Sequence, residues 1–195
     1  LSGLISLGLS AFFWLPSLLE KQFTLVDAIL TKELADYKLH FVYIRQLWNS
    51  PWGYGGSLYG LEDGLSFQVG KLHIVVSIVS VVLLIVLMLK KDVKEKKKFL
   101  SFPIVCLILL AFSIFMTTFH SVAIWDLVKV LSYIQFPWRF LLFSAVFTSA
   151  MGGFLIYVLE KHLPLKINTT ITGALIGIAI FLAFPYVRPS QYLKV

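Results

Sequence analysis

The chain alternates between long apolar runs and shorter polar segments, and the apolar runs have the length that crosses a bilayer. A transmembrane helix needs roughly 20 consecutive, mostly apolar residues. These runs lack the alternation of barrel strands, and only a helix satisfies its own backbone groups within lipid. The sequence therefore predicts an all-α, polytopic bundle of about five spans. The predicted spans are Leu1–Leu19, Leu72–Leu89, Phe99–Phe119, Phe140–Leu159 and Ile167–Tyr186.

The composition agrees with a membrane location. Hydrophobic residues make up 58% of the chain and charged residues 14%, whereas soluble domains carry about 25% charged residues. A soluble fold of this composition would expose large apolar patches and aggregate. The opening segment Leu1–Ile5 contains no methionine and no basic residue. We therefore expect it to be the remainder of a membrane helix, and the chain to be a single transmembrane domain from a longer protein.

Positive charge is concentrated in one short segment. The net charge is +7, and six lysines lie within residues 90–98 without a basic groove or an aromatic RNA-binding motif, so no nucleic-acid partner is predicted. Short loops rich in Lys and Arg stay in the cytoplasm. We therefore predict a cytoplasmic loop over residues 90–98, with Lys161 and Lys166 on the same side. Residues 20–70 and 120–139 then form two outward-facing segments.

Both outward segments show the spacing of interfacial amphipathic helices. In the first segment the apolar positions are Val26, Ile29, Leu34, Tyr37, Phe41, Ile44 and Trp48. In the second they are Val122, Ile124, Trp125, Leu127, Val128, Leu131 and Ile134. The second predicted helix ends at Pro137, which cannot continue it.

Residues 49–70 are dense in glycine and proline, which end regular structure. Trp52 and Tyr54 alternate with these glycines, and Glu62 and Asp63 sit together further along. Aromatic faces and neighbouring carboxylates suit a carbohydrate or lipid-headgroup site, because rings pack on sugar C–H faces and carboxylates accept hydroxyl protons. The competing interpretation is an interfacial aromatic belt, where Trp and Tyr are enriched in any membrane protein.

Arg139 follows Trp138 at the expected water boundary of a span. An arginine there can bind a phosphate or diphosphate with two parallel hydrogen bonds, or it can be a snorkelling anchor. His40 and Arg45 lie on the polar side of the first predicted interfacial helix and are weaker candidates. No histidine pair has the spacing of a metal-ligating helix, so no metal site is predicted.

Several phrases of the chain resemble one family of multi-pass membrane proteins of bacteria and archaea, labelled 6-pyruvoyl-tetrahydropterin synthase-related. The layout is similar to YfhO-like proteins and, more distantly, to GT-C glycosyltransferases. Nothing in the chain supports pterin chemistry. A pterin synthase is soluble and uses a histidine-bound zinc, whereas this chain has no suitable cluster of histidines. The phrases that carry the resemblance are Ala11–Glu20, Ser50–Gly55, Asp63-Gly64, Ser66–Gly70 and Ile134–Leu141.

The GT-C resemblance implies transfer of a sugar from a polyprenyl-phosphate donor, on the outer side of a bacterial or archaeal plasma membrane. In that superfamily the catalytic carboxylate usually lies in the first outward loop, near the N-terminus of the protein. We expect this chain to begin after that loop, and the catalytic carboxylate therefore to lie outside it. By their chemistry, Arg139 would bind the donor phosphate, and Glu62 and Asp63 would bind sugar hydroxyls or a divalent cation. The rings of Trp52, Tyr54 and Trp138 would stack on the sugar or contact lipid.

Two further functions stay open at the level of sequence. A transporter or flippase of lipid-linked saccharides predicts a polar cavity that continues between the spans. A non-catalytic membrane scaffold predicts that the Gly/aromatic loop packs flat, with Glu62, Asp63 and Arg139 pointing separately into water.

Overall fold

The computed structural model describes residues 2–25, 36–89 and 96–187, and this part of the chain contains helices and no strand. The α-helices are α1 (Ser2–Leu9), α2 (Ala11–Leu19), α4 (Ile44–Trp48), α5 (Lys71–Leu89), α6 (Lys96–Thr117), α7 (Val122–Leu127), α8 (Leu141–His162) and α9 (Leu165–Ala183). Short 3₁₀ helices cover Glu20–Phe23, Tyr37–Leu39, Phe119–Ser121, Lys129–Ile134, Pro137–Phe140 and Phe184–Val187.

Four helices, α5, α6, α8 and α9, are long and apolar enough to cross a membrane, and they confirm four of the predicted spans. Helix α8 runs three residues beyond its predicted end, because Lys161 and His162 are basic side chains in the last turn, where they favour the negative end of the helix. Pro164 then starts α9, since proline fits a helix N-terminus and cannot continue a preceding helix.

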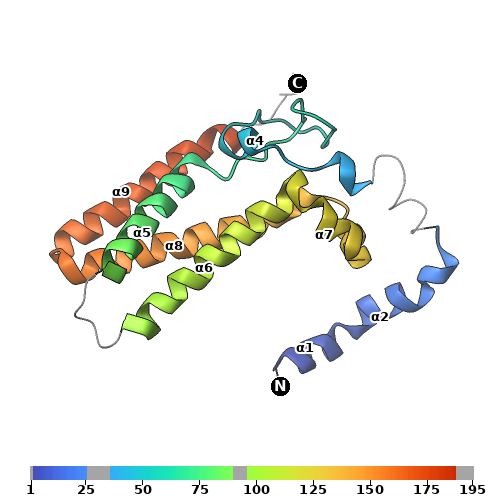
Figure 1. Ribbon diagram of the computed structural model, residues 1–195, viewed down its shortest axis with the longest axis horizontal. Helices are drawn as coiled ribbons and strands as arrows, with labels where there is room; N and C mark the ends of the chain where they lie inside the picture. Colours follow the sequence, from blue (N-terminus) through green and yellow to red (C-terminus); the bar gives the residue numbers. More distant parts are fainter. Residues whose placement is uncertain (1, 26–35, 90–95, 188–195) are drawn as a thin grey trace, which may run out of the picture.

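The first predicted span consists of two helices, α1 and α2, bent by 64° at Ser10. The Ser10 hydroxyl donates to the carbonyl of Ser6 at 2.8 Å, one of the contacts with which serine bends a helix. Figure 1 shows the pair away from the other spans, and neither helix buries a residue. The pair counts as a fifth span if its two helices cross the bilayer together.

Helix α8 contacts each of the other three long spans and forms the centre of the bundle (Figure 1). A buried apolar cluster joins α5, α6 and α8 and contains Leu84, Leu100, Phe154 and Val158. Closer to the middle, the Ser80 hydroxyl on α5 donates to the Met151 carbonyl on α8 at 2.9 Å. A small residue at this point lets the two backbones approach closely, as is typical of membrane helix pairs.

Residues 36–70 and 118–140 fold together at one end of the bundle, and we call them the loop layer (Figure 1). The backbone N–H of Val42 donates to the Thr117 carbonyl at 3.0 Å, and that of Val69 donates to the Leu47 carbonyl at 3.0 Å. Two buried clusters hold the layer to the spans. One contains Phe41, Met116 and Trp125, and the other contains Val42, Leu47 and Phe67.

The opposite end of the bundle carries the end of α8 and the start of α9, with Lys161 and Lys166 (Figure 1). Residues 36–70 and 120–139, which belong to the two segments predicted to face outward, therefore lie at the same end of the bundle, away from these lysines. Which side of the membrane each end faces stays a prediction from the lysine distribution. Of the predicted cytoplasmic loop, residues 90–95 lie outside the described part.

The prediction of one interfacial helix reaching Trp48 is wrong for the part that the structure describes. After the turn Tyr37–Leu39 the chain is not helical over residues 40–43, and α4 follows. Phe41 and Val42 are both buried, in different clusters, so adjacent side chains enter the core on opposite sides as in an extended chain. The predicted positions Val26, Ile29 and Leu34 lie outside the described residues.

The second predicted interfacial helix forms in two pieces, α7 and the 3₁₀ helix Lys129–Ile134. The break is at Val128, which has φ −98° and ψ 79°. Trp125 is 1% exposed and faces the core, whereas Leu127 is 83% exposed. The chain then turns through Gln135, which has a positive φ of 64°, so that Pro137 begins the next helical segment.

Candidate functional site

The glycine-rich loop is folded by close contacts between its own backbone segments. The N–H of Gly55 donates to the Gly64 carbonyl at 2.8 Å, and the N–H of Gly64 donates to the Gly56 carbonyl at 2.9 Å. A Cβ atom at Gly55 would lie 2.8 Å from the Gly64 Cα, so a side chain cannot fit between these two backbone segments. The glycines therefore serve the loop closure, and the loop is ordered by backbone pairing.

Asp63 is 8% exposed, and its carboxylate is bonded within the loop layer. Its Oδ2 accepts a hydrogen bond from the Gln46 side-chain amide at 2.5 Å, and its Oδ1 accepts one from the backbone N–H of Leu58 at 2.8 Å. The other end of the Gln46 amide accepts from the Tyr43 N–H at 2.9 Å. This network joins α4 to the loop, so the Asp63 carboxylate holds the loop in place and does not face solvent beside Glu62.

A ring stack forms where the second segment of the loop layer enters α8. The rings of Phe136 and Trp138 are stacked with centroids 5.4 Å apart, and the Arg139 guanidinium carbon lies 5.1 Å from the centroid of Phe136. The edge of the Phe136 ring meets His40, with centroids 4.8 Å apart. Three sequence-predicted residues, His40, Trp138 and Arg139, are thus brought together around one ring that the prediction did not single out.

Arg139 is exposed, and its Nη1 donates to the Ile134 carbonyl at 2.9 Å. This bond fixes the guanidinium over the Phe136 ring, and a guanidinium has five N–H donors in all. The side chain thus has a defined place at the surface. An arginine so held is suited to bind an anion, because less conformational entropy is lost when the ligand arrives.

Trp52 and Tyr54 lie apart from the ring stack, against the end of α9. Their ring centroids are 6.0 Å apart, and Trp52 meets the ring of Tyr186 edge-on at 5.1 Å. The Gln68 side-chain amide donates to the Tyr186 hydroxyl at 2.5 Å. These contacts tie the glycine-rich loop to the last turn of the α9 segment.

Beneath these contacts is a cavity of about 650 Å³, which we call the head cavity. Its walls are Trp52, Ser66, residues 68–73 and residues 179 and 181–186. Lys71, His73 and Gln68 give it polar groups at the start of α5, while α9 supplies an apolar wall. The cavity thus lies where the loop layer meets the ends of two spans.

The remaining predicted residues are separate from these two sites. Glu62 and Arg45 are exposed, and neither lines the head cavity. No group of three His, Cys, Asp or Glu side chains that could hold a metal occurs among residues 2–25, 36–89 and 96–187. The predicted pair of carboxylates for a divalent cation is therefore not formed, because Asp63 turns inward and Glu62 outward.

An ionic contact that the sequence prediction missed connects the two segments of the loop layer. Asp126 on α7 accepts a hydrogen bond from the Tyr37 hydroxyl at 2.5 Å, and the Lys38 ammonium lies 2.9 Å from the same oxygen. These two contacts, the Tyr37 bond first, hold the pKa of Asp126 below its usual value. Burial and the bond to Asp126 raise the pKa of Tyr37, and Asp126 raises that of Lys38.

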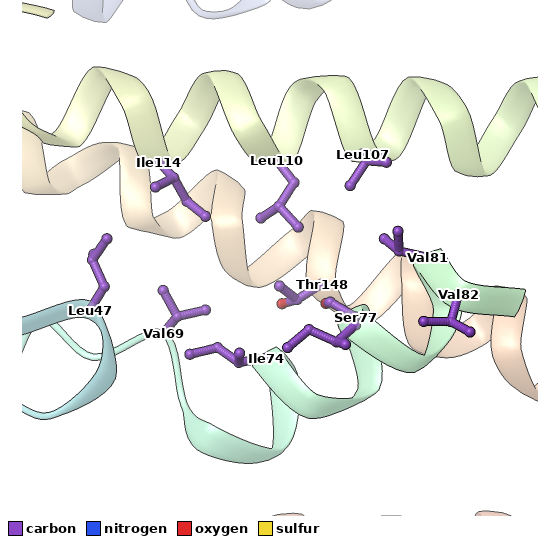
Figure 2. A pocket seen from close by; sticks show the side chains of 11 residues that line it. Leu47, Val69, Ile74, Ser77, Val81, Val82, Leu107, Leu110, Ile114 and Thr148 are labelled. Carbon is purple, nitrogen blue, oxygen red and sulfur yellow. The ribbon is translucent and has the colours of Figure 1, made fainter. Parts of the chain in front are cut away.

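Among the described residues, grooves also lie between the spans. Figure 2 shows the first, about 380 Å³ between α5, α6 and α8, with Ile74, Leu110 and Ile114 among the apolar side chains that line it. Ser77 also lines this groove, and its buried hydroxyl has no hydrogen-bond partner among the described residues. The second groove, about 260 Å³, lies between α5, α8 and α9, and its lining includes Leu72, Val76, Gly152, Thr172 and Ile176. We call it the chain groove.

Comparisons of the chain with protein-family models, with curated proteins and with solved structures give no match. The resemblance to the 6-pyruvoyl-tetrahydropterin synthase-related family therefore stays a prediction from the phrases quoted above.

Proposed function

We propose that this chain is the membrane part of a glycosyltransferase that takes a sugar from a polyprenyl-phosphate donor at the loop-layer end of the bundle. The observation that carries this proposal is the head cavity, because it combines aromatic walls, hydrogen-bonding groups and a cation at the end of the spans. A lipid-linked sugar needs these features together, since its sugar and phosphate are polar and its chain remains in the membrane.

Within this proposal, the exposed rings of Trp52 and Tyr54 bind the sugar. Trp52 is 47% exposed and Tyr54 is 62% exposed, so ring surface is accessible beside the cavity. Aromatic faces pack on the C–H groups of a sugar, and Gln68 supplies an amide for hydroxyl groups. Two basic side chains are candidates for the phosphate of the donor: Arg139 on the ring stack and Lys71 at the cavity.

The transporter alternative is less favoured because it requires a polar route between the spans. The walls of the groove in Figure 2 carry no charged side chain, and its hydroxyl groups belong to Ser77 and Thr148. The Thr148 hydroxyl already donates to the Ser144 carbonyl at 2.8 Å. A saccharide that entered this groove would leave most of its hydroxyl groups without partners, at a cost of about 1–3 kcal/mol for each.

The scaffold alternative requires a loop that packs flat against the bundle. The loop layer instead leaves a cavity of about 650 Å³ at the start of α5. Glu62 and Arg139 are nevertheless both exposed and separate, as a scaffold predicts. The cavity therefore favours a binding function, and this distinction is open to experiment.

The test is transfer of radiolabelled sugar from a panel of polyprenyl-phosphate donors by the full-length parent protein in membranes. Wild type is compared with Trp52→Ala and Arg139→Ala, with Arg45→Ala as the control, because Arg45 is exposed and lies outside both sites. We expect transfer by the wild type and the control, and about tenfold slower transfer with Trp52→Ala. A similar reduction with Arg139→Ala would support Arg139 as the residue that binds the donor phosphate. Absence of transfer from every donor would overturn the proposal.

A further inference from the structure

The head cavity and the chain groove are adjoining parts of one space. Both are lined by Leu72, His73 and Ala179. The head cavity lies at the loop layer, where Lys71 and Gln68 face it, and the chain groove continues from these shared residues between the spans. A ligand that fills both is therefore polar at one end and apolar at the other.

Residues from one face of each of three spans, α5, α8 and α9, line the chain groove. On α9 its lining residues are Thr172, Leu175, Ile176 and Ala179, which follow the spacing of one helical face. On α5 the lining includes Leu72 and Val76, which are four residues apart. Asn168 is the one buried residue of α9, and Thr172, Leu175 and Ala179 are only partly buried, so the groove face of α9 is not closely packed against the bundle.

Gly152 is one of the α8 residues that line the chain groove. A Cβ atom there would lie 3.4 Å from Cγ1 of Val76, and both residues line the groove, so we expect a larger side chain to occupy part of this space. At the neighbouring Gly153, a Cβ atom would meet nothing within 4 Å. The two adjacent glycines thus provide a test position and a matched control on the same helix.

We propose that the head cavity and the chain groove together form a binding site for a single-chain anionic lipid, with its phosphate beside Lys71 and His73 and its chain between α5, α8 and α9. The chain groove continues from the cavity with about 260 Å³, and we assign this space to one lipid chain. The ammonium of Lys71 complements the phosphate, and the aromatic edge at Trp52 and Tyr186 borders the headgroup.

This inference deepens the proposed function and rests on it for the identity of the lipid, because polyprenyl phosphates are single-chain anionic lipids. It assigns the phosphate to Lys71 instead of Arg139, the position that the sequence favours. Arg139 belongs to the ring stack and does not line the cavity that leads to the groove.

The experiment measures binding of radiolabelled polyprenyl phosphate to the full-length protein in nanodiscs of neutral phospholipid. We expect Lys71→Gln to weaken binding about tenfold, the loss of one charge-assisted contact. Gly152→Leu should weaken binding at least as much, whereas Gly153→Leu and Arg45→Gln should leave it unchanged, because Gly153 and Arg45 do not line the head cavity or the chain groove. The thermal unfolding midpoint without ligand is measured for each variant, and Ala179→Phe replaces Gly152→Leu if that variant does not fold.

Competition identifies the chemical class of the lipid. Unlabelled polyprenyl phosphate should displace the label, and polyprenyl alcohol, which lacks the phosphate, should do so at least about tenfold less well. Displacement by two-chain phosphatidylglycerol as effective as that by polyprenyl phosphate would overturn the single-chain assignment. Equal effects of Gly152→Leu and Gly153→Leu, or no effect of Lys71→Gln, would overturn the site. Binding as expected without any sugar transfer would support the lipid site and overturn the proposed function alone.

Discussion

The carboxylate of Asp63 and the side-chain amide of Gln46 form a 2.5 Å hydrogen bond inside the loop layer, and the two residues are 8% and 2% exposed. Gln46 belongs to α4, and Asp63 belongs to the glycine-rich loop. The bond therefore fixes the loop relative to a helix whose Leu47 carbonyl accepts a hydrogen bond from the N–H of Val69, two residues before α5 begins. The shape of the loop layer depends on a buried carboxylate that the sequence suggests as a ligand.

Replacement of Asp63 by alanine should destabilise the protein by about 1–3 kcal/mol, because the Gln46 amide and the Leu58 N–H lose their acceptor in a buried place. The unfolding free energy in detergent measures this effect. Glu62→Ala is the control, since the neighbouring side chain is exposed and its loss should change stability by less than about 0.5 kcal/mol. Equal effects of the two variants would contradict a structural role for Asp63.

The contact of Asp126 with Tyr37 and Lys38 predicts a dependence on pH. The lowered pKa of Asp126 means that its contribution to stability is present above the pKa of an unfolded aspartate, about 4, and is lost as the pH falls through the lowered value. Unfolding midpoints of the wild type and Asp126→Asn should therefore differ at pH 7 and converge in acid. A difference that is constant from pH 7 to pH 3 would contradict this assignment.

The contact between α5 and α8 at Ser80 should be sensitive to side-chain size. Ser80→Ala removes the hydrogen bond to the Met151 carbonyl and should cost about 0.6 kcal/mol, an average value for such bonds in membranes. Ser80→Leu should cost about 1–3 kcal/mol or more, because Ser80 and Met151 are both fully buried and a larger side chain at position 80 overpacks the contact. Val79→Leu, at an exposed position on the same helix, is the control. Unfolding in detergent measures all three, and a Ser80→Leu variant as stable as the control would contradict the close packing.

The ring of Trp52 should contribute to sugar recognition. Trp52→Ala should reduce the rate of sugar transfer about tenfold, which corresponds to a loss of about 1.4 kcal/mol of aromatic contact. Trp48→Ala is a matched control, because Trp48 is 49% exposed on α4 and does not line the head cavity. Equal rates for the two variants would remove Trp52 from the site.

Much of the fold was predictable from the sequence because lipid imposes one rule on every span. The apolar runs that became α5, α6, α8 and α9 need no knowledge of their neighbours, since each helix satisfies its own backbone groups. The bend at Ser10 was not predictable in this way, because Ser10 lies inside a run that is otherwise uniformly apolar.

The loop layer was predictable only in part, because its residues depend on tertiary contacts. The helical spacing of Tyr37, Phe41 and Ile44 is real, but the segment is drawn along the end of α6 by the bond of Val42 to Thr117. The same holds for the candidate site. Trp52 and Tyr54 were identified by type, whereas Lys71, His73 and Tyr186 were missed because they sit at or beside span ends and no local pattern shows that α5 and α9 meet there.

The most direct measurement is photo-crosslinking of the full-length protein in membranes with a polyprenyl-phosphate sugar donor that carries a photoreactive group beside the phosphate. Crosslinked peptides are identified by mass spectrometry, with excess unlabelled donor as competitor. The account predicts labelling that the competitor suppresses within residues 66–76 and 179–187. These two segments contain residues that line the head cavity and the part of the chain groove next to it. Competed labelling confined to α1 and α2, or to the ring stack at Arg139, would contradict it.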